Sequence, residues 1–530
     1  MAGISRRQLV QGAAATAAVT LRAPAVRAQN DQQTLRFVAQ ANLGVLDPIW
    51  TSAYITRNHG FLVYDTLFGT DEKHQIKPQM VDQTVVSADG MTYRFTLRDG
   101  LRWHDGKPVL SEDCVESLKR WGKKDRLGQL LMAHTARIAA VDSKTFMLAL
   151  AEPFGLVLEA LGKTGSNVPF MMPARIAATP PDDQIKEVIG SGPFRFAKDE
   201  WIPGVQVEYI RNSDYIPRNE APSGSTGGKK AYIDKVIWRY IADPWDAAEF
   251  LVTGEVDWWE EPPIDFMPKL EQNPELQTFV IDPLGQQGWL RPNWLHPPFN
   301  NKKAREALLH TTDQVTYLHW SLGESKYYRA CNSVFACDGP YSTTAGAEPI
   351  MAHNMLKATQ LLKESGYDGT PVVVLQIKDR PFLNAAAVVT RQRLEQAGFR
   401  VILKAVDWAT FLVVRARKEP PEKGGWNLLF TWWNGADVID PSVHFGLSGA
   451  GPNSWFGWPT VPQLEKLAIE WMRANDYAKR KQIADEIQRV ALSEVTYVPW
   501  GEWIQPTVFR KNVRDVLRFG APIFWNVKLA

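Results

Sequence analysis

The chain has 530 residues, of which 45% are hydrophobic and 22% are charged. This composition is typical of a folded globular protein and excludes a disordered chain, a fibrous repeat and a coiled coil. The net charge of +2 provides no basic excess that would point to nucleic acid as a partner. Because a single hydrophobic core stops growing at about 250–300 residues, the length predicts several domains. The content of 21 Trp residues indicates large cores or pockets lined by aromatic rings.

The N-terminal segment has the three parts of an export signal. Ser5-Arg6-Arg7 precedes an apolar, alanine-rich run over residues 9–21, and small residues stand at positions −3 and −1 of a cleavage site after Ala28. The run is shorter than the roughly 20 residues that span a bilayer. We therefore predict a twin-arginine (Tat) signal peptide over residues 1–28. Its removal takes away only basic charge, and the net charge of the remaining chain becomes −2.

The first half of the remaining chain predicts strands that flank an inserted unit. Turn dipeptides such as Asp89-Gly90 and Asp99-Gly100 are typical of hairpins, and Ser111 is a predicted N-cap for a helix to about residue 124. The segment 217–230, rich in Pro, Ser and Gly, predicts an exposed loop. Around this hairpin-and-helix unit we predict a helix at 56–68 and strands at 35–40, 204–211 and 232–241.

Beyond residue 300 the pattern changes to alternating helices and buried strands. This β-α-β-α-β order predicts a parallel, doubly wound sheet. The predicted strands are 372–377, 401–406 and 428–431, and the predicted helices are 302–309, 314–322, 353–365, 384–397, 410–417, 461–474 and 476–493.

Ligands bind beyond the carboxyl ends of the strands in such a sheet, and this rule selects a set of side chains. Aromatic rings with a few polar groups are typical of a small-molecule pocket. Trp432 and Trp433 are adjacent in a strand, so at most one of them points into a given cleft. Asp437 is a candidate for binding an ammonium group or a sugar hydroxyl. The other candidates from these strand ends and the following loop are Arg380, Trp408, Asn434, Trp455 and Phe456.

The cysteine spacing and the absence of catalytic motifs bear on the disulfide content and on whether the chain is an enzyme. Cys331 and Cys337 lie six residues apart, and in an exported chain we predict a disulfide between them, with two reduced thiols as the alternative. Cys114 is predicted to be a buried apolar residue. The sequence contains no Walker, H-E-x-x-H or C-x-x-C motif, and we expect no metal and no cofactor. We expect His104 in its hairpin turn to be structural.

The sequence resembles the ABC-transporter extracytoplasmic solute-binding proteins of family 5, which include oligopeptide-, dipeptide- and nickel-binding proteins. The strongest segment runs from Val63 to Glu112 and includes Thr92-Tyr93-Arg94-Phe95 and Trp103-His104-Asp105-Gly106. Further similar segments are Gly190-Ser191-Gly192-Pro193-Phe194, Gly254-Glu255-Val256-Asp257, Pro297-Pro298-Phe299 and Leu361-Leu362-Lys363-Glu364-Ser365-Gly366-Tyr367.

The resemblance implies an α/β fold of the two-lobed periplasmic-binding-protein kind, type II and cluster C, with an extra subdomain. It divides the chain into lobe I (29–69, 189–284 and 500–530), the extra subdomain of lobe I (70–188) and lobe II (285–499). It further implies a ligand-binding role for Asp437, which falls where peptide-binding members place the carboxylate for the peptide amino end. Tyr54 is expected near the cleft on lobe I.

The function that this resemblance implies is solute capture rather than catalysis. The chain would bind peptide-like or other medium-sized solutes in the periplasm, as a monomer, and deliver them to ABC permease subunits in the inner membrane, with no role for nucleic acid. Two alternatives stay open. One is an exported hydrolase that uses the same cleft, which would need a nucleophile near a base. The other is a receptor of the same fold that signals to a membrane sensor.

Overall fold

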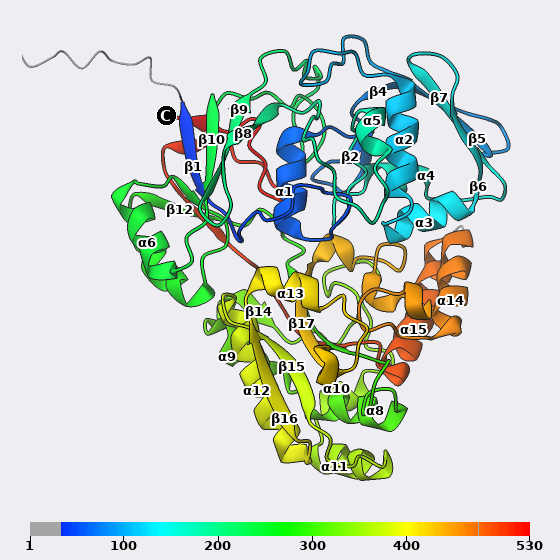
Figure 1. Ribbon diagram of the computed structural model, residues 1–530, viewed down its shortest axis with the longest axis vertical. Coiled ribbons are helices and arrows are strands. Elements are labelled where there is room, and N and C mark those ends of the chain that lie inside the picture. Colours follow the sequence, from blue (N-terminus) through cyan, green and yellow to red (C-terminus); the bar gives the residue numbers. More distant parts are fainter. Residues whose placement is uncertain (1–32, 475) are drawn as a thin grey trace, which may run out of the picture.

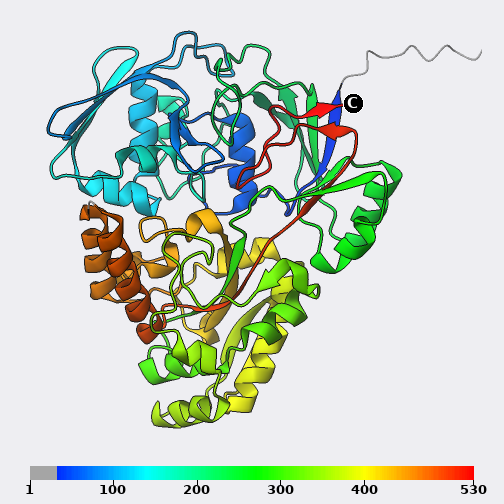
Figure 2. The same cartoon turned by 180° about the vertical axis from the view of Figure 1, so that it is seen from behind.

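The computed structural model describes residues 33–474 and 476–530, and these form two lobes that meet along a central seam (Figures 1 and 2). The predicted signal peptide, residues 1–28, lies outside the described residues. In Figure 1 the upper lobe holds the N-terminal half of the chain together with the C-terminal end, and the lower lobe holds the helices between Lys302 and Glu494. In the part of the chain that the structure describes, no helix combines the length and apolar character that a membrane crossing needs.

Lobe I is built on a seven-stranded sheet that collects strands from distant parts of the chain. β1 is parallel to both β10 and β11, whereas β9 and β19 run antiparallel to their neighbours. In its core, the Phe37 ring lies 5.0 Å from the ring of Phe524, so the C-terminal segment completes this lobe. The sheet order is β12 (Leu276–Phe279), β19 (Thr507–Arg510), β11 (Trp258–Trp259), β1 (Thr34–Val38), β10 (Lys235–Arg239), β9 (Gln206–Arg211) and β8 (Phe194–Ile202).

The helices α1 (Tyr54–Val63) and α6 (Pro244–Thr253) belong to lobe I, and an inserted unit follows α1 in the chain. This unit contains the predicted hairpins, which form a four-stranded antiparallel sheet. Its elements are β4 (Val81–Val86), β5 (Thr92–Leu97), β7 (Thr145–Leu150), β6 (Thr135–Ala140), α2 (Ser111–Trp121) and α3 (Arg126–Ala133).

Two local predictions for lobe I are wrong. Ser111 is the first residue of α2 rather than its cap, and the Asp113 carboxylate accepts the Leu110 backbone N–H at 2.8 Å instead. The segment 217–230 is not an exposed loop throughout, because its second half is buried. There Lys229 forms a 2.7 Å ion pair with Asp65, and this pairing offsets part of the cost of burying the ammonium group.

Lobe II contains a six-stranded sheet that is mixed rather than wholly parallel. β15, β16 and β17 are parallel, as predicted, but β13 and β18 run antiparallel to their neighbours. β13 follows the first segment that connects the lobes, and β18 precedes the second. Neither strand is joined to its neighbour in the sheet by a crossover helix, which is the connection that parallel strands require. The sheet order is β14 (Tyr328–Arg329), β18 (Val498–Trp503), β13 (Gln286–Pro292), β17 (Leu428–Asn434), β15 (Val372–Ile377) and β16 (Val401–Val406).

The helices of lobe II follow the predicted pattern closely. α9 packs beside β18, and α12 packs against β15 and β16. Gly366 and Gly398 have positive φ angles of 74° and 103° just after α11 and α12, where the sequence predicts helix ends. The bounds are α8 (Lys302–Thr311), α9 (Gln314–Leu322), α11 (Met355–Glu364), α12 (Pro381–Ala397), α13 (Trp408–Val414), α14 (Pro462–Arg473) and α15 (Tyr477–Glu494).

The chain passes between the lobes after β12 and again after β18. Because β18 pairs within the lobe II sheet through Trp503, the return passage lies at residues 504–506, a few residues later than the predicted boundary at 499/500. A disulfide joins Cys331 and Cys337. Cys114 lies in α2 with no exposed surface, in agreement with its predicted place in a core.

Candidate functional site

The two lobes are joined at the seam by the carboxylate of Asp437. The hydroxyl of Tyr54, the first residue of α1, donates to Asp437 Oδ2 at 2.7 Å. The backbone N–H and hydroxyl of Ser166 donate to Asp437 Oδ1 at 2.8 and 3.0 Å. Asp437 follows β17 in lobe II, whereas both donors belong to lobe I. These bonds therefore connect the two lobes directly.

The surroundings of Asp437 leave it no exposed surface. A Cβ atom at Gly165 would lie 2.1 Å from Asp437 Oδ1, so only glycine fits there in this arrangement. The Tyr54 hydroxyl also accepts the Asn434 backbone N–H at 2.7 Å. Burial, together with the negative charge of Asp437, raises the pKa of Tyr54 well above its usual value, so the hydroxyl stays a donor. The predicted residues Tyr54, Asn434 and Asp437 thus lie together, but the Tyr54 hydroxyl and the Asp437 carboxylate bind protein groups, and the Asn434 side chain binds Gln286 and the Gly520 carbonyl oxygen.

Trp432 and Trp433 point to opposite faces of β17, as strand alternation predicts. The Trp432 ring lies 5.3 Å from that of Trp408. The Trp433 ring lies 5.4 Å from that of Trp455 and 6.4 Å from that of Tyr54. The two tryptophans therefore contribute to different parts of the seam.

Arg380 lies between the rings at the ends of β15, β16 and β17. Its guanidinium carbon is 5.2 Å from the ring centre of Trp408 and 5.4 Å from that of Trp432, in cation–π geometry. The side chain is 7% exposed, and its Nη2 has no hydrogen-bond partner among the described residues. Burial lowers the pKa of Arg380, while the nearby charge of Glu261 opposes this shift. A partly unsatisfied cation thus lies at the ends of three strands, the edge of the sheet that the strand-end rule selects for ligand binding.

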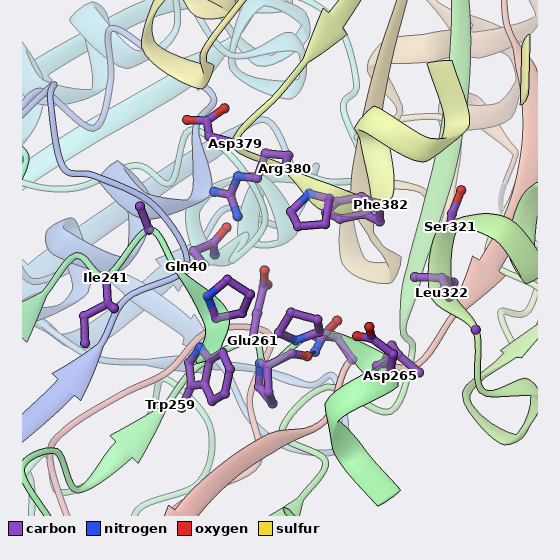
Figure 3. Close-up of a pocket in the computed structure, with 18 of the residues that line it drawn as sticks. Gln40, Ile241, Trp259, Glu261, Asp265, Ser321, Leu322, Asp379, Arg380 and Phe382 are labelled. Carbon is purple, nitrogen blue, oxygen red and sulfur yellow. Dashed lines mark hydrogen bonds between the residues drawn. The ribbon is translucent and has the colours of Figure 1, made fainter. Parts of the chain in front are cut away.

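A cavity of about 320 Å³ opens next to Arg380 between the lobes (Figure 3). Figure 3 shows Trp259, Glu261 and Asp265 on the lobe I side, opposite Asp379 and Arg380 of lobe II. Rings, a cation and several carboxylates therefore face one space, and this is the make-up of a pocket for a polar organic solute.

Two acids at the lobe I side of this region were not among the predicted residues. Glu260 accepts the Gln40 backbone N–H at 2.7 Å and the Asn58 side-chain N–H at 2.8 Å. Burial, with a contribution from the charge of Glu261, raises the pKa of Glu260 to about 8, and burial also raises the pKa of Glu261. Both acids follow β11, which is parallel to β1. The strand-end rule would have identified them if residues 258–259 had been predicted as a strand.

A second cavity, of about 420 Å³, also lies between the lobes, because residues of both lobes line it. Trp455 and Phe456 line it, as do Arg126 of α3 and Arg415, the residue after α13. A narrow space of about 20 Å³ adjoins both cavities, because Arg380 is shared with the first cavity and Arg415 with the second. Asp437 lines neither of the two larger cavities.

Among the described residues, no histidine is hydrogen-bonded to a serine hydroxyl or to a carboxylate. His104 contacts the Gly192 carbonyl oxygen through Nε2 at 3.1 Å, which agrees with a structural role. In this part of the chain the one cluster of potential metal ligands is Cys331, Cys337 and Glu502. Its two sulfurs are joined in the disulfide, so they are not available as thiolate ligands.

Comparison with known proteins gives a consistent result. Residues 75–455 match the family model described as bacterial extracellular solute-binding proteins, family 5. The "Probable peptide ABC transporter periplasmic-binding protein y4tO" of Sinorhizobium fredii is 36% identical and aligns over 99% of this chain and 100% of its own length.

Solved structures of this fold superpose on most of the chain. The agropinic acid complex of AgaA from A. tumefaciens R10 has a TM-score of 0.79 at 20% identity, covering 94% of this chain and 99% of the other. The Helicobacter pylori DppA complex with the peptide STSA has a TM-score of 0.78 at 22% identity, covering 94% and 98%. Both are two-lobed periplasmic binding proteins, and the family comprises binding proteins of ABC importers rather than enzymes. The chain is therefore a member of the family 5 extracellular solute-binding proteins, with the two-lobed fold of that family.

Proposed function

We propose that the chain captures a peptide-like or other medium-sized solute between its lobes and releases it unchanged. The observation that carries this proposal is the pair of seam cavities, each lined by side chains of both lobes. A solute in such a cavity contacts both lobes only when they are closed. Its binding then stabilises the closed form by its difference in affinity for the two forms.

The proposed partners and location follow from the family. We propose that the closed protein delivers its solute to ABC permease subunits in the inner membrane, that it acts in the periplasm as a monomer, and that residues 1–28 direct its export by the Tat route. Support comes from the relative named as a periplasmic-binding protein and from the twin-arginine pattern at Arg6 and Arg7. Neither nucleic acid nor a cofactor has a part in this proposal.

Within the site, we propose that Arg380 contacts the solute in the first cavity and that Trp455 and Phe456 contact it in the second, while Trp408 and Trp432 line the narrow space between the two cavities. We propose a different role for Asp437 from the one implied by the family resemblance. Its carboxylate would hold the lobes together through Tyr54 and Ser166, because those groups already occupy both of its oxygens.

The proposal can be tested on protein that lacks residues 1–28. A tripeptide library is mixed with the protein, and native mass spectrometry counts the bound peptides while chromatography follows their integrity. We expect bound, uncleaved peptides, a higher melting temperature in their presence, and at least tenfold weaker binding by Trp455→Ala, because Trp455 lines the second cavity. Trp245→Ala is the matched control, because Trp245 is 64% exposed and lines neither cavity.

Two results would count against this function. Cleavage of the peptides by the purified protein would favour the hydrolase. Equal binding by Trp455→Ala and Trp245→Ala would move the site away from the seam.

A further inference from the structure

One loop of lobe II forms a large part of the wall of the second cavity. This loop, residues 445–456, contributes the rings of Phe445, Trp455 and Phe456 together with three polar residues. Its regular structure is limited to two short helical turns, at 445–447 and 451–453. The place of the rings therefore depends on contacts between the loop and the rest of the lobe.

Arg291 of β13 binds both ends of this loop. Its Nη1 donates to the Gly446 carbonyl oxygen at 3.0 Å, and its Nε donates to that of Phe456 at 2.8 Å. Its Nη2 donates to the Trp455 carbonyl oxygen at 3.3 Å. Nη1 also donates to the Thr496 carbonyl oxygen, shortly after α15, at 2.9 Å. One side chain thus connects both ends of the loop to β13 and to the end of α15.

Arg291 is a buried cation whose partners are all neutral. It has no exposed surface, and in the part of the chain that the structure describes it forms no ion pair with a carboxylate. Burial lowers the pKa of Arg291 to about 9, so the guanidinium is still charged at neutral pH. A buried charge is costly, and the carbonyl oxygens of the loop offset that cost here. The planar fork of a guanidinium reaches several acceptors at once, which a lysine ammonium does not.

The loop also packs closely on Arg291. A Cβ atom at Gly457, whose φ is 102°, would lie 2.9 Å from Arg291 Nε and 2.7 Å from the Pro292 carbonyl oxygen. The guanidinium carbon lies 5.7 Å from the ring centre of Trp455, in cation–π geometry. Arg291 itself lines neither of the two larger cavities. It can therefore act on a solute in them only through the loop.

We propose that Arg291 is a positioning residue for solute binding, which fixes the 445–456 loop so that the rings of Trp455 and Phe456 form the wall of the second cavity. This proposal rests on the proposed function, in which those rings contact the solute. A solute that places an aromatic side chain against a fixed aromatic wall buries more apolar surface than one with a small side chain. Arg291 thus sets the preference of the cavity for aromatic side chains without touching the solute.

The test compares Arg291→Met and Arg291→Lys with Arg305→Met. Arg305 is the matched control, because it is a second buried arginine of lobe II, 3% exposed, and it lines neither of these cavities. Its Nε and Nη1 also donate to carbonyl oxygens, those of Glu494 and Phe299, each at 3.0 Å.

Two measurements are made on each protein. Without ligand, fluorine NMR of protein labelled with fluorotryptophan follows the resonance of Trp455, which is assigned through Trp455→Phe. With ligand, calorimetry measures binding of two tripeptide libraries that differ only in having phenylalanine or alanine at one position. If Arg291→Met does not fold, Arg291→Lys provides the same two measurements.

We expect the wild-type protein to bind the phenylalanine library roughly tenfold more tightly than the alanine library. Arg291→Met should shift or broaden the Trp455 resonance and lose most of this preference. Arg291→Lys keeps the charge but not the fork, so it should lie between Arg291→Met and the wild type. Arg305→Met should keep both the resonance and the preference, even where its melting temperature falls, because a purely structural arginine affects stability and not selectivity.

The measurements separate the failure of this inference from that of the proposed function. An unchanged Trp455 resonance in Arg291→Met, or an equal preference in Arg291→Met and Arg305→Met, would overturn the role of Arg291 and leave solute capture in place. Equal affinity of the wild-type protein for both libraries would have the same meaning, because the wall would then not select aromatic side chains. Absence of binding by either library, with the Trp455 resonance shifted in Arg291→Met, would overturn the capture of peptide-like solutes but not the anchoring of the loop.

Discussion

The contact between Tyr54 and Asp437 should control how readily the lobes open. Tyr54→Phe keeps the ring next to Trp433 and removes only the hydroxyl, which donates to Asp437 at 2.7 Å and accepts the Asn434 N–H at 2.7 Å. In the open form, water can replace these partners, so the loss falls mainly on the closed form. A hydrogen bond to a charged group contributes about 1.5–3 kcal/mol. Tyr54→Phe should therefore shift the equilibrium roughly 10- to 150-fold toward the open form.

A second variant tests the same contact by steric means. Gly165→Ala places a Cβ atom 2.1 Å from Asp437 Oδ1, so the lobes cannot close as they do here unless the backbone shifts. Gly155→Ala is the control, because its Cβ atom would meet only the Met472 carbonyl oxygen at 3.8 Å, which is ordinary van der Waals contact. Both glycines lie in the same inserted unit of lobe I and face lobe II.

The lobe equilibrium is measured without added ligand, by small-angle X-ray scattering and by energy transfer between dyes on the two lobes. Tyr54→Phe and Gly165→Ala should give a larger radius of gyration and a larger distance between dyes than Gly155→Ala, which should match the wild type. If all three variants match the wild type in both measurements, Asp437 does not hold the lobes together and our reasoning about the seam fails.

Three further results are expected. In the folded protein Glu260 keeps its proton up to about pH 8, whereas in the unfolded chain a glutamate releases it at about pH 4.3. The free energy of unfolding should therefore fall as the pH rises between these two values. In thermal melts, Glu260→Gln should show a smaller decrease of melting temperature over this pH range. Loss of the Cys331–Cys337 disulfide in the double serine variant should cost about 2 kcal/mol for a loop of this length, read from denaturant unfolding of lobe II. Cys114 should resist thiol reagents in the native protein and react with them after unfolding. It has no exposed surface, and burial raises the pKa of its thiol. Fast labelling of the native protein would contradict this burial.

Local patterns in the sequence were sufficient for most elements of lobe II. The predicted ranges 314–322, 372–377 and 401–406 coincide with α9, β15 and β16. These predictions succeed because apolar periodicity and glycine caps act within a few residues of one another. The same patterns carry no information on strand direction. The prediction of parallel strands is confirmed for β15, β16 and β17, whereas β13 and β18 join the same sheet in antiparallel orientation where the chain passes between the lobes.

The sequence predicted the part of the candidate site that lies at the strand ends of lobe II, because only those strand ends were recognised. Arg380, Trp408 and Trp432 were selected because three parallel strands end at the same edge of a sheet, and the structure places them in contact. The arginines of the second cavity had no such signal. Arg126 and Arg415 are 289 residues apart in the sequence, and only the meeting of the lobes gives them a common cavity.

The sequence by itself determined the family, the α/β class and the chemical types of side chain at the strand ends, because these depend on local order along the chain. The tertiary structure decided which groups those side chains meet. Asp437 is the clearest case: its place after β17 follows from the sequence, but its partners Tyr54 and Ser166 lie 383 and 271 residues away. A carboxylate that is open to an ammonium group and one that is occupied by protein donors have the same local sequence, and only the packing of one lobe on the other distinguishes them.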